Sequence, residues 1–112
     1  MNETALVRQI LDYCKYRDLM FWRNQSGQVK TVNKYGDQHM MRLGILGSPD
    51  IIGCMFGWFI GVEAKVGKNK QTDYQKDFEK RLIAAGGLYK VVYTLDEFIE
   101  FIDEIKSKAK AV

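Results

Sequence analysis

The fold is decided by residues 48–65, which read SPDIIGCMFGWFIGVEAK. Two apolar runs, Pro49–Met55 and Trp58–Val66, flank a glycine, and this pattern predicts a β-hairpin that turns near that glycine. Successive side chains of a strand point to opposite faces, so Glu63 and Lys65 are expected to leave the same face of the sheet. Three other side chains are expected to point into a core on the opposite face: Val62, Ala64 and Val66.

The sequence after this hairpin predicts a crossover helix and a further strand. Thr72-x-x-Gln75 is a capping box, which places the threonine at the N-cap of a helix and the glutamine at N3. The helix is expected to run to about Ala85 and to stop at Gly86-Gly87. The apolar segment Leu88–Thr94 is expected to form a strand parallel to the one before the helix, because a crossover connects parallel neighbours.

The remaining segments give the expected order α-β-β-β-β-α-β-α. We therefore predict an α/β fold with a mixed β-sheet flanked by helices. The other expected elements are a helix at Glu3–Tyr16, a short strand at Leu19–Arg23, a strand or extended loop at Gln28–Tyr35, an irregular stretch at Gly36–Gly47 and an amphipathic helix at Asp96–Lys108.

The length and composition predict a single soluble domain covering residues 1–112. The hydrophobic share of 46% and the net charge of +3 permit binding to a polyanion without requiring it. The first residues lack the pattern of a signal peptide. Asp50 and several glycines interrupt the nearly uncharged stretch Leu43–Val62, so no membrane span is expected.

The two cysteines, Cys14 and Cys54, match neither a zinc-ligand pair nor a disulfide framework. Both stand among apolar residues. We expect buried free thiols and a reducing, cytoplasmic location.

Asp50 and the Glu63-Ala64-Lys65 tripeptide carry the candidate chemistry. An acidic residue on one segment followed by Glu-x-Lys on the next is the layout of a metal-dependent phosphodiesterase site. Two carboxylates are suitable oxygen ligands for Mg²⁺ or Mn²⁺. The lysine is expected to act beside the metal on water or phosphate.

The Gly47-Ser48-Pro49-Asp50, Glu63-Ala64-Lys65 and Gln75 pattern resembles the PD-(D/E)xK nuclease superfamily, and within it the VRR-NUC group, whose small stand-alone domains occur in phages. The resemblance implies a restriction-endonuclease-like fold, hydrolysis of DNA phosphodiester bonds and action inside a bacterial host cell. It also implies a metal ligand in the Ala64 carbonyl. Gln75, besides its capping role, is implied to help hold Lys65 or the attacking water, and Glu3, at the start of the first helix, to contact the metal.

Basic and polar residues outside this motif are candidates for substrate contacts. Lys68 and Lys70 follow the motif on a predicted loop, and His39 and Arg42 precede Asp50 on a segment that could form one wall of a substrate groove. DNA is the expected partner, with branched forms such as junctions or flaps preferred. A homodimer is expected, because a small enzyme that acts on two strands commonly pairs its active sites by two-fold symmetry.

Two alternatives stay open on the sequence alone. One is a non-catalytic nucleic-acid-binding or assembly module that keeps the fold. The other is a nuclease that acts on RNA, or on a specific duplex in defence.

Overall fold

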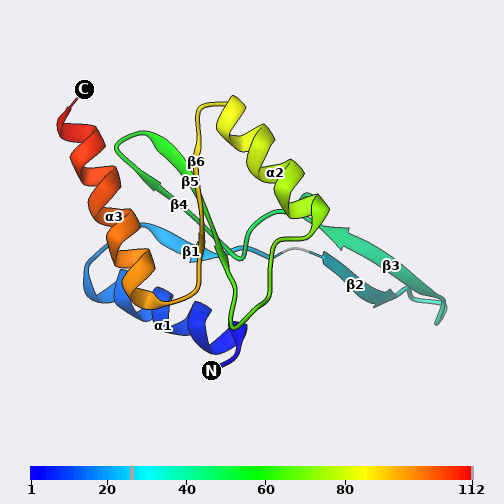
Figure 1. Ribbon diagram of the computed structural model, residues 1–112. Helices are drawn as coiled ribbons and strands as arrows, with labels where there is room; N and C mark the ends of the chain where they lie inside the picture. The colour runs from blue at the N-terminus through cyan, green and yellow to red at the C-terminus, as the bar shows by residue number, and fades with distance from the viewer. Residues whose placement is uncertain (26, 112) are drawn as a thin grey trace.

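The computed structural model describes residues 1–25 and 27–111, apart from the side chains of residues 42 and 43. It is an α/β structure with a four-stranded mixed sheet of order β1-β4-β5-β6 and a separate two-stranded ribbon, β2-β3 (Figure 1). The elements are α1 (Glu3–Tyr16), β1 (Phe21–Arg23), β2 (Gly27–Val32), β3 (Gln38–Leu43), β4 (Ile51–Met55), β5 (Trp58–Ala64), α2 (Asp73–Ala84), β6 (Leu88–Val92) and α3 (Leu95–Lys110).

The hairpin predicted at residues 49–66 is confirmed as β4 and β5. These strands are antiparallel, and Met55 opposite Trp58 closes the ladder. The connecting residues Phe56 and Gly57 have φ angles of 52° and 84°. Two consecutive positive φ angles are what a type I′ turn requires, and this turn matches the twist of the strands it joins.

The crossover is confirmed as well. β5 and β6 are parallel, and α2 connects them. Both halves of the capping box are present: the Gln75 N–H donates to Thr72 Oγ1 at 3.2 Å, and the Thr72 N–H donates to Gln75 Oε1 at 2.8 Å. The helix ends at Ala84, with Ala85 as its C-cap and Gly86 at a φ of 96°.

The predicted order lacked one strand. Residues 36–47 were expected to be irregular, but Gln38–Leu43 pairs with Gly27–Val32 along its whole length. The turn between the two strands is organised by Asn33, whose Oδ1 accepts the N–H groups of Tyr35 and Asp37. The pattern was missed because the ribbon is solvated on both faces, so its sequence carries no alternation of apolar and polar residues.

The two faces of the main sheet are covered differently. α1 and α3 pack on one face and α2 lies over the other (Figure 1). A Cβ atom on Gly61 of β5 would lie 3.2 Å from Leu82 Cδ2, so this glycine lets α2 approach the sheet closely. The fully buried core lies on the α1 and α3 side and includes Leu6, Ile10, Ile60, Val62, Ala64, Phe98 and Ile102.

The expectation for the cysteines holds for one of the two. Cys14 is buried on α1, and burial raises the pKa of its thiol to about 12. Cys54 is exposed, contrary to the prediction. Its neighbour Gly53 points to the face that Phe21 covers, so Cys54 points to the other face. There, α2 lies over β6 and the adjoining part of β5 and leaves the Cys54 end of β4 uncovered.

The helices of the described residues are too short or too polar to cross a membrane.

Candidate active site

The predicted carboxylates come together where β4 begins and β5 ends. Asp50 directly precedes β4, and its Oδ2 accepts the N–H of Ala64, the last residue of β5, at 2.9 Å. The backbone of Asp50 is held in turn by Asn24, whose N–H donates to the Asp50 carbonyl at 2.7 Å. The Asn24 side chain also donates to the Pro49 carbonyl and to Ser48 Oγ, each at 2.9 Å. Asn24 therefore fixes the segment that presents Asp50.

Glu63 is the electrostatic centre of this arrangement. Its side chain is 2% exposed, and within the described part of the chain its Oε2 atom has no hydrogen-bond partner. Burial raises the pKa of Glu63 to about 9, reinforced by a side-chain hydrogen bond with Asp50 and by the Asp50 charge. The nearby Lys65 ammonium acts in the opposite direction. The site thus holds a buried carboxyl group that lacks a full set of partners.

Lys65 lies beside Glu63, as predicted. Its N–H donates to the Val92 carbonyl on β6 at 3.0 Å, which continues the parallel ladder by one residue. The side chain is only 7% exposed. A buried ammonium is stable only near negative charge. Lys65 is therefore a constrained component of the site and differs from an ordinary solvated lysine.

Glu3 reaches the same region from α1. Its Oε2 accepts the side-chain N–H of Asn69 at 3.0 Å, and the Tyr93 hydroxyl donates to the Asn69 carbonyl at 2.8 Å. The charge of Glu3 contributes to the raised pKa of Glu63. Asn69 and Tyr93 were missed in the sequence analysis because these contacts join residues 66 and 24 positions apart.

Gln75 is placed close to the segment that carries Asp50. A Cβ atom on Gly47 would lie 2.2 Å from the Tyr74 carbonyl and 3.0 Å from the Gln75 nitrogen, so only glycine lets this loop meet the first turn of α2. The capping hydrogen bond engages the Gln75 Oε1 atom. The predicted role of Gln75, which is to hold Lys65 or the attacking water, therefore requires its NH₂ group. This role stays a prediction.

A second polar cluster lies next to the carboxylates and was not predicted. The Gln71 side chain donates to Glu79 at 3.0 Å and to the Tyr89 hydroxyl at 3.2 Å. Burial raises the pKa of Tyr89, and the charges of Glu63, Glu79 and Asp50 raise it further. This network ties the loop after β5 to α2 and β6. Gln71 stands one residue before a capping box and gave no separate signal.

The predicted substrate contacts fall into two groups. Lys68 and Lys70 are exposed on the loop that follows Lys65. His39 lies on the ribbon, where its Nε2 is 3.4 Å from the Asn33 side-chain nitrogen. Arg42 belongs to the same strand, β3, and its side chain lies outside the described residues.

The donor set fits magnesium better than a metal that needs a cage of side chains. Within residues 1–25 and 27–111, no three His, Cys, Asp or Glu side chains are grouped so that they could hold an ion. Mg²⁺ typically takes one or two carboxylates and keeps several waters for substrate phosphates. Asp50 together with the unpartnered Oε2 of Glu63 meets that requirement.

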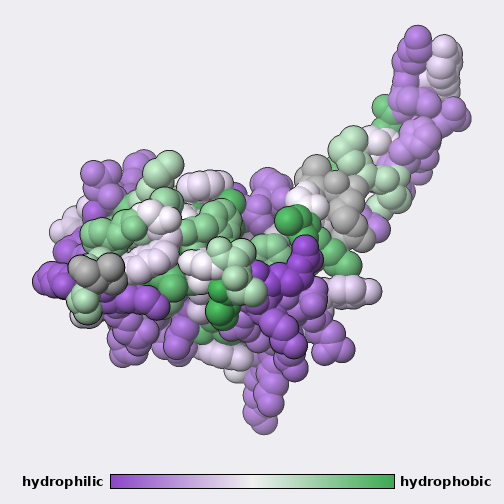
Figure 2. All heavy atoms as spheres, turned by 90° about the horizontal axis from the view of Figure 1, so that it is seen from above, coloured by the Kyte–Doolittle hydropathy of each residue, from purple (hydrophilic) through white to green (hydrophobic). Residues whose placement is uncertain are grey.

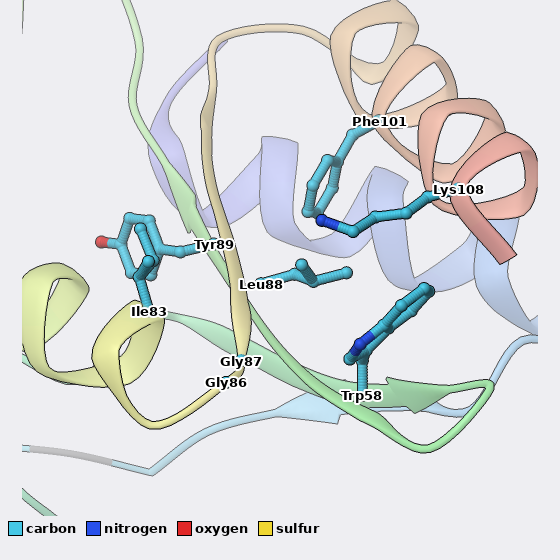
Figure 3. Close-up of a pocket in the computed structure, with 8 residues that line it drawn as sticks. All are labelled: Trp58, Ile83, Gly86, Gly87, Leu88, Tyr89, Phe101 and Lys108. Atoms are coloured by element: carbon cyan, nitrogen blue, oxygen red, sulfur yellow. The ribbon is translucent and has the colours of Figure 1, made fainter. Parts of the chain in front are cut away.

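A pocket at the other end of β5 and β6 is separate from this site. Its Tyr89 hydroxyl points away from Trp58 and Lys108, toward the α2 side (Figure 3). The Lys108 ammonium lies 5.6 Å from the centroid of the Trp58 ring. Its lining is Trp58, Ile83, Gly86, Gly87, Leu88, Tyr89, Phe101 and Lys108, which includes no carboxylate. The pocket therefore offers a cation no side-chain carboxylate.

No family model matches this chain, and a search of curated proteins finds no significant match.

Proposed function

We propose that this protein is a metal-dependent endonuclease of the PD-(D/E)xK superfamily, related to the VRR-NUC group, that hydrolyses DNA phosphodiester bonds. The observation that carries the proposal is the buried Glu63 carboxyl, which lies against Asp50 and has an oxygen without a partner in the described chain. A buried carboxyl that lies against a second carboxyl costs stability unless a cation or a proton lies with them. A fold that keeps them together favours a role in binding a cation.

Three groups of the chain would hold the ion. Asp50 and Glu63 supply carboxylate oxygens, and Ala64 supplies its carbonyl. A residue in a strand directs its backbone N–H and C=O groups toward the same side of the strand. The Ala64 N–H donates to Asp50, so the Ala64 carbonyl also faces the Asp50 side. When bound there, Mg²⁺ or Mn²⁺ supplies Lewis acidity to the phosphate and lowers the pKa of water.

Lys65 and Gln75 act on the reacting groups themselves. The Lys65 ammonium, held beside Glu63, stabilises the negative charge that develops on the phosphate as water attacks phosphorus. The Gln75 amide orients that water. The phosphorus–oxygen bond to the leaving strand then breaks and its oxygen takes a proton, with no covalent enzyme intermediate.

We further propose that the enzyme acts as a homodimer on branched DNA. Trp22 and Phe59 are 45% and 44% exposed, and the strand register places both on the sheet face that α2 covers only in part. Aromatic side chains are enriched in the cores of protein interfaces. A sedimentation run at micromolar concentration should show twice the 13.0 kDa chain mass, and a 13.0 kDa species alone would contradict the dimer.

The test is cleavage of a labelled four-way junction, a flap and a plain duplex with Mg²⁺, with Mn²⁺ and with EDTA. Lys65→Ala should lower the single-turnover rate by about 100- to 1,000-fold, the range for losing one group that stabilises a transition state. Lys110→Ala is the matched control, because it removes the same charge from an exposed position at the C-terminal end of α3.

A metal-dependent rate that Lys65→Ala removes and Lys110→Ala keeps supports the proposal. The order of the three substrates then gives the target. A folded wild type that binds DNA but cuts none of the three overturns the proposal, and would identify a binding module.

A further inference from the structure

The β2-β3 ribbon is anchored directly to the candidate active site. It leaves the body after Asn24 and returns to it shortly before Asp50. Asn24 joins these two ends through its hydrogen bonds to Ser48, Pro49 and Asp50. The base of the ribbon is therefore held beside the segment that carries Asp50.

The ribbon has no core of its own. Figure 2 shows it extending well beyond the body, with a hydrophilic tip, and the molecule measures 57 Å along its long axis against 32 and 29 Å across. Its described side chains are exposed or half-buried, including Val32 at 62% and Met40 at 59% exposed. An isolated two-stranded hairpin is marginally stable in water. The ribbon therefore has the exposure expected of a surface that binds a partner.

The charge of the ribbon favours a polyanion as that partner. Residues 27–43 contain three basic residues and one acidic residue, a net charge of +2 out of +3 for the whole chain. The acidic residue, Asp37, accepts a hydrogen bond from Asn33 within the turn at 3.3 Å. Lys34 lies in the same turn, with its ammonium 5.1 Å from the centroid of the Tyr35 ring. The ribbon therefore carries most of the excess positive charge of the protein.

The polar groups of the ribbon are divided unevenly between its two faces. Cross-strand partners share a face, so the register places Gln28, Lys30 and Gln38 on one side, together with Val32 and Met40. Val29 and Met41 lie on the other side together with Thr31 and His39. Amide and ammonium side chains are the groups that hydrogen-bond base edges in the major groove of DNA.

We propose that the β2-β3 ribbon enters the major groove of duplex DNA beside the cut site, with Gln28, Lys30 and Gln38 toward the bases and Lys34 at a phosphate. A two-stranded ribbon fits this groove, which is about 12 Å wide. The inference rests on the proposed nuclease function for its choice of DNA. A ribbon bound in this way holds one duplex arm of the substrate beside the active site.

The first test is binding to a labelled duplex of about 20 base pairs, which at 3.4 Å per base pair exceeds the 57 Å long axis of the protein. EDTA prevents cutting, and Kd is measured against salt concentration. The Lys30→Ala/Lys34→Ala double variant should lower the slope of log Kd against log salt by about 1, since Lys34 is the lysine placed at a phosphate and each phosphate contact contributes about 0.9. Lys106→Ala/Lys110→Ala removes the same charge at the far end of the molecule, on α3, and should keep the slope (Figure 1).

The second test is methylation of the bound duplex by dimethyl sulfate. Guanine N7 lies in the major groove and adenine N3 in the minor groove. The wild type should protect N7 positions beside the cut site and leave N3 reactive, and Gln28→Ala/Gln38→Ala should weaken that protection. Protection of N3 alone would overturn the proposal.

The outcomes separate this inference from the nuclease proposal. A wild type that cuts DNA, while the ribbon variants keep the wild-type salt slope, overturns the ribbon inference and leaves the nuclease standing. A wild type that cuts no DNA, yet binds it with a salt slope that depends on Lys30 and Lys34, overturns the nuclease proposal and supports the ribbon inference. If Val29→Ser/Met41→Ser dissociates a dimer and the lysine variants leave DNA binding unchanged, the ribbon is a dimerisation arm and the proposal is wrong.

Discussion

The chain contains two antiparallel hairpins that follow each other in sequence but differ in burial and in the contacts that hold them. The β4-β5 hairpin lies at the centre of the sheet, where Ile51, Ile60 and Val62 are fully buried. The β2-β3 ribbon projects into solvent and is held by its ladder and its turn. A polar group in the first hairpin, such as Glu63, is costly and indicates function. Polar groups in the second are ordinary for a surface, and only their arrangement is informative.

The largest expected contrast is in stability. Ile60→Ala should lower the free energy of unfolding by about 2–5 kcal/mol, because it leaves a cavity among fully buried side chains. Val32→Ala in the ribbon should change it by less than about 0.5 kcal/mol. Urea unfolding followed by circular dichroism measures both. Equal losses in the two variants would mean that the ribbon belongs to the cooperative core.

Thiol chemistry should reproduce the same contrast within the body. With its pKa raised from 9.0 to about 12, Cys14 has about a thousandfold less thiolate than a free thiol, at one power of ten per pKa unit. An alkylating reagent at pH 8 should therefore label Cys54 rapidly and leave Cys14 unmodified. Because the pKa is higher in the folded state, the stabilising contribution of Cys14 is fully present below pH 9 and is lost as pH rises from about 9 to 12.

Cys14→Ala should remove that alkaline loss of stability, although it also opens a small cavity. Mass spectrometry of the alkylated protein settles the labelling order. Labelling of Cys14 as fast as Cys54 would contradict its burial on α1.

The turn of the buried hairpin offers a smaller, stabilising change. Phe56 holds a φ of 52°, a left-handed conformation unusual for an aromatic residue, and its side chain is 63% exposed. Phe56→Asn creates the Asn-Gly pair that type I′ turns prefer. We expect thermal unfolding to show a gain of about 1 kcal/mol, because asparagine tolerates the left-handed conformation that costs other L-residues about 1–2 kcal/mol. A loss of stability would show that the Phe56 ring contributes packing that outweighs the strain.

The smallest global effect is expected in the turn of the ribbon. Asn33→Ala removes the acceptor of the Tyr35 and Asp37 N–H groups. Hydrogen exchange should become faster along β2 and β3 while the free energy of global unfolding changes by less than about 0.5 kcal/mol, since exposed segments open locally. Unchanged exchange in the ribbon would show that Asn33 does not maintain its order.

The same contrast explains what the sequence could predict. The α2 capping box, the Gly86 stop and the parallel β5-β6 pair follow from local chemistry and apolar runs, and all are confirmed. β3 was missed because a solvated ribbon has no buried face to impose a pattern. The exposure of Cys54 depends on how far α2 extends over the sheet, which no local signal gives.

At the site, sequence spacing placed Glu63 and Lys65 on one face, as the alternation of a strand requires. It could not reveal Asn24 and Asn69, whose hydrogen bonds span 24 to 66 residues of chain. Such contacts are created by the tertiary fold, and each of these residues alone looks like a common turn residue.

The most direct test of the central claim is the thermal unfolding of wild type and Glu63→Gln, each with EDTA and with Mn²⁺. In EDTA near pH 7 the variant should be about as stable as the wild type, because the raised pKa of Glu63 keeps its carboxyl protonated and an amide of the same shape replaces a neutral group. Saturating Mn²⁺ should raise the Tm of the wild type and leave that of the variant almost unchanged. A wild-type Tm that does not respond to Mn²⁺, or an equal rise in both proteins, would contradict the assignment of Asp50 and Glu63 as a metal site.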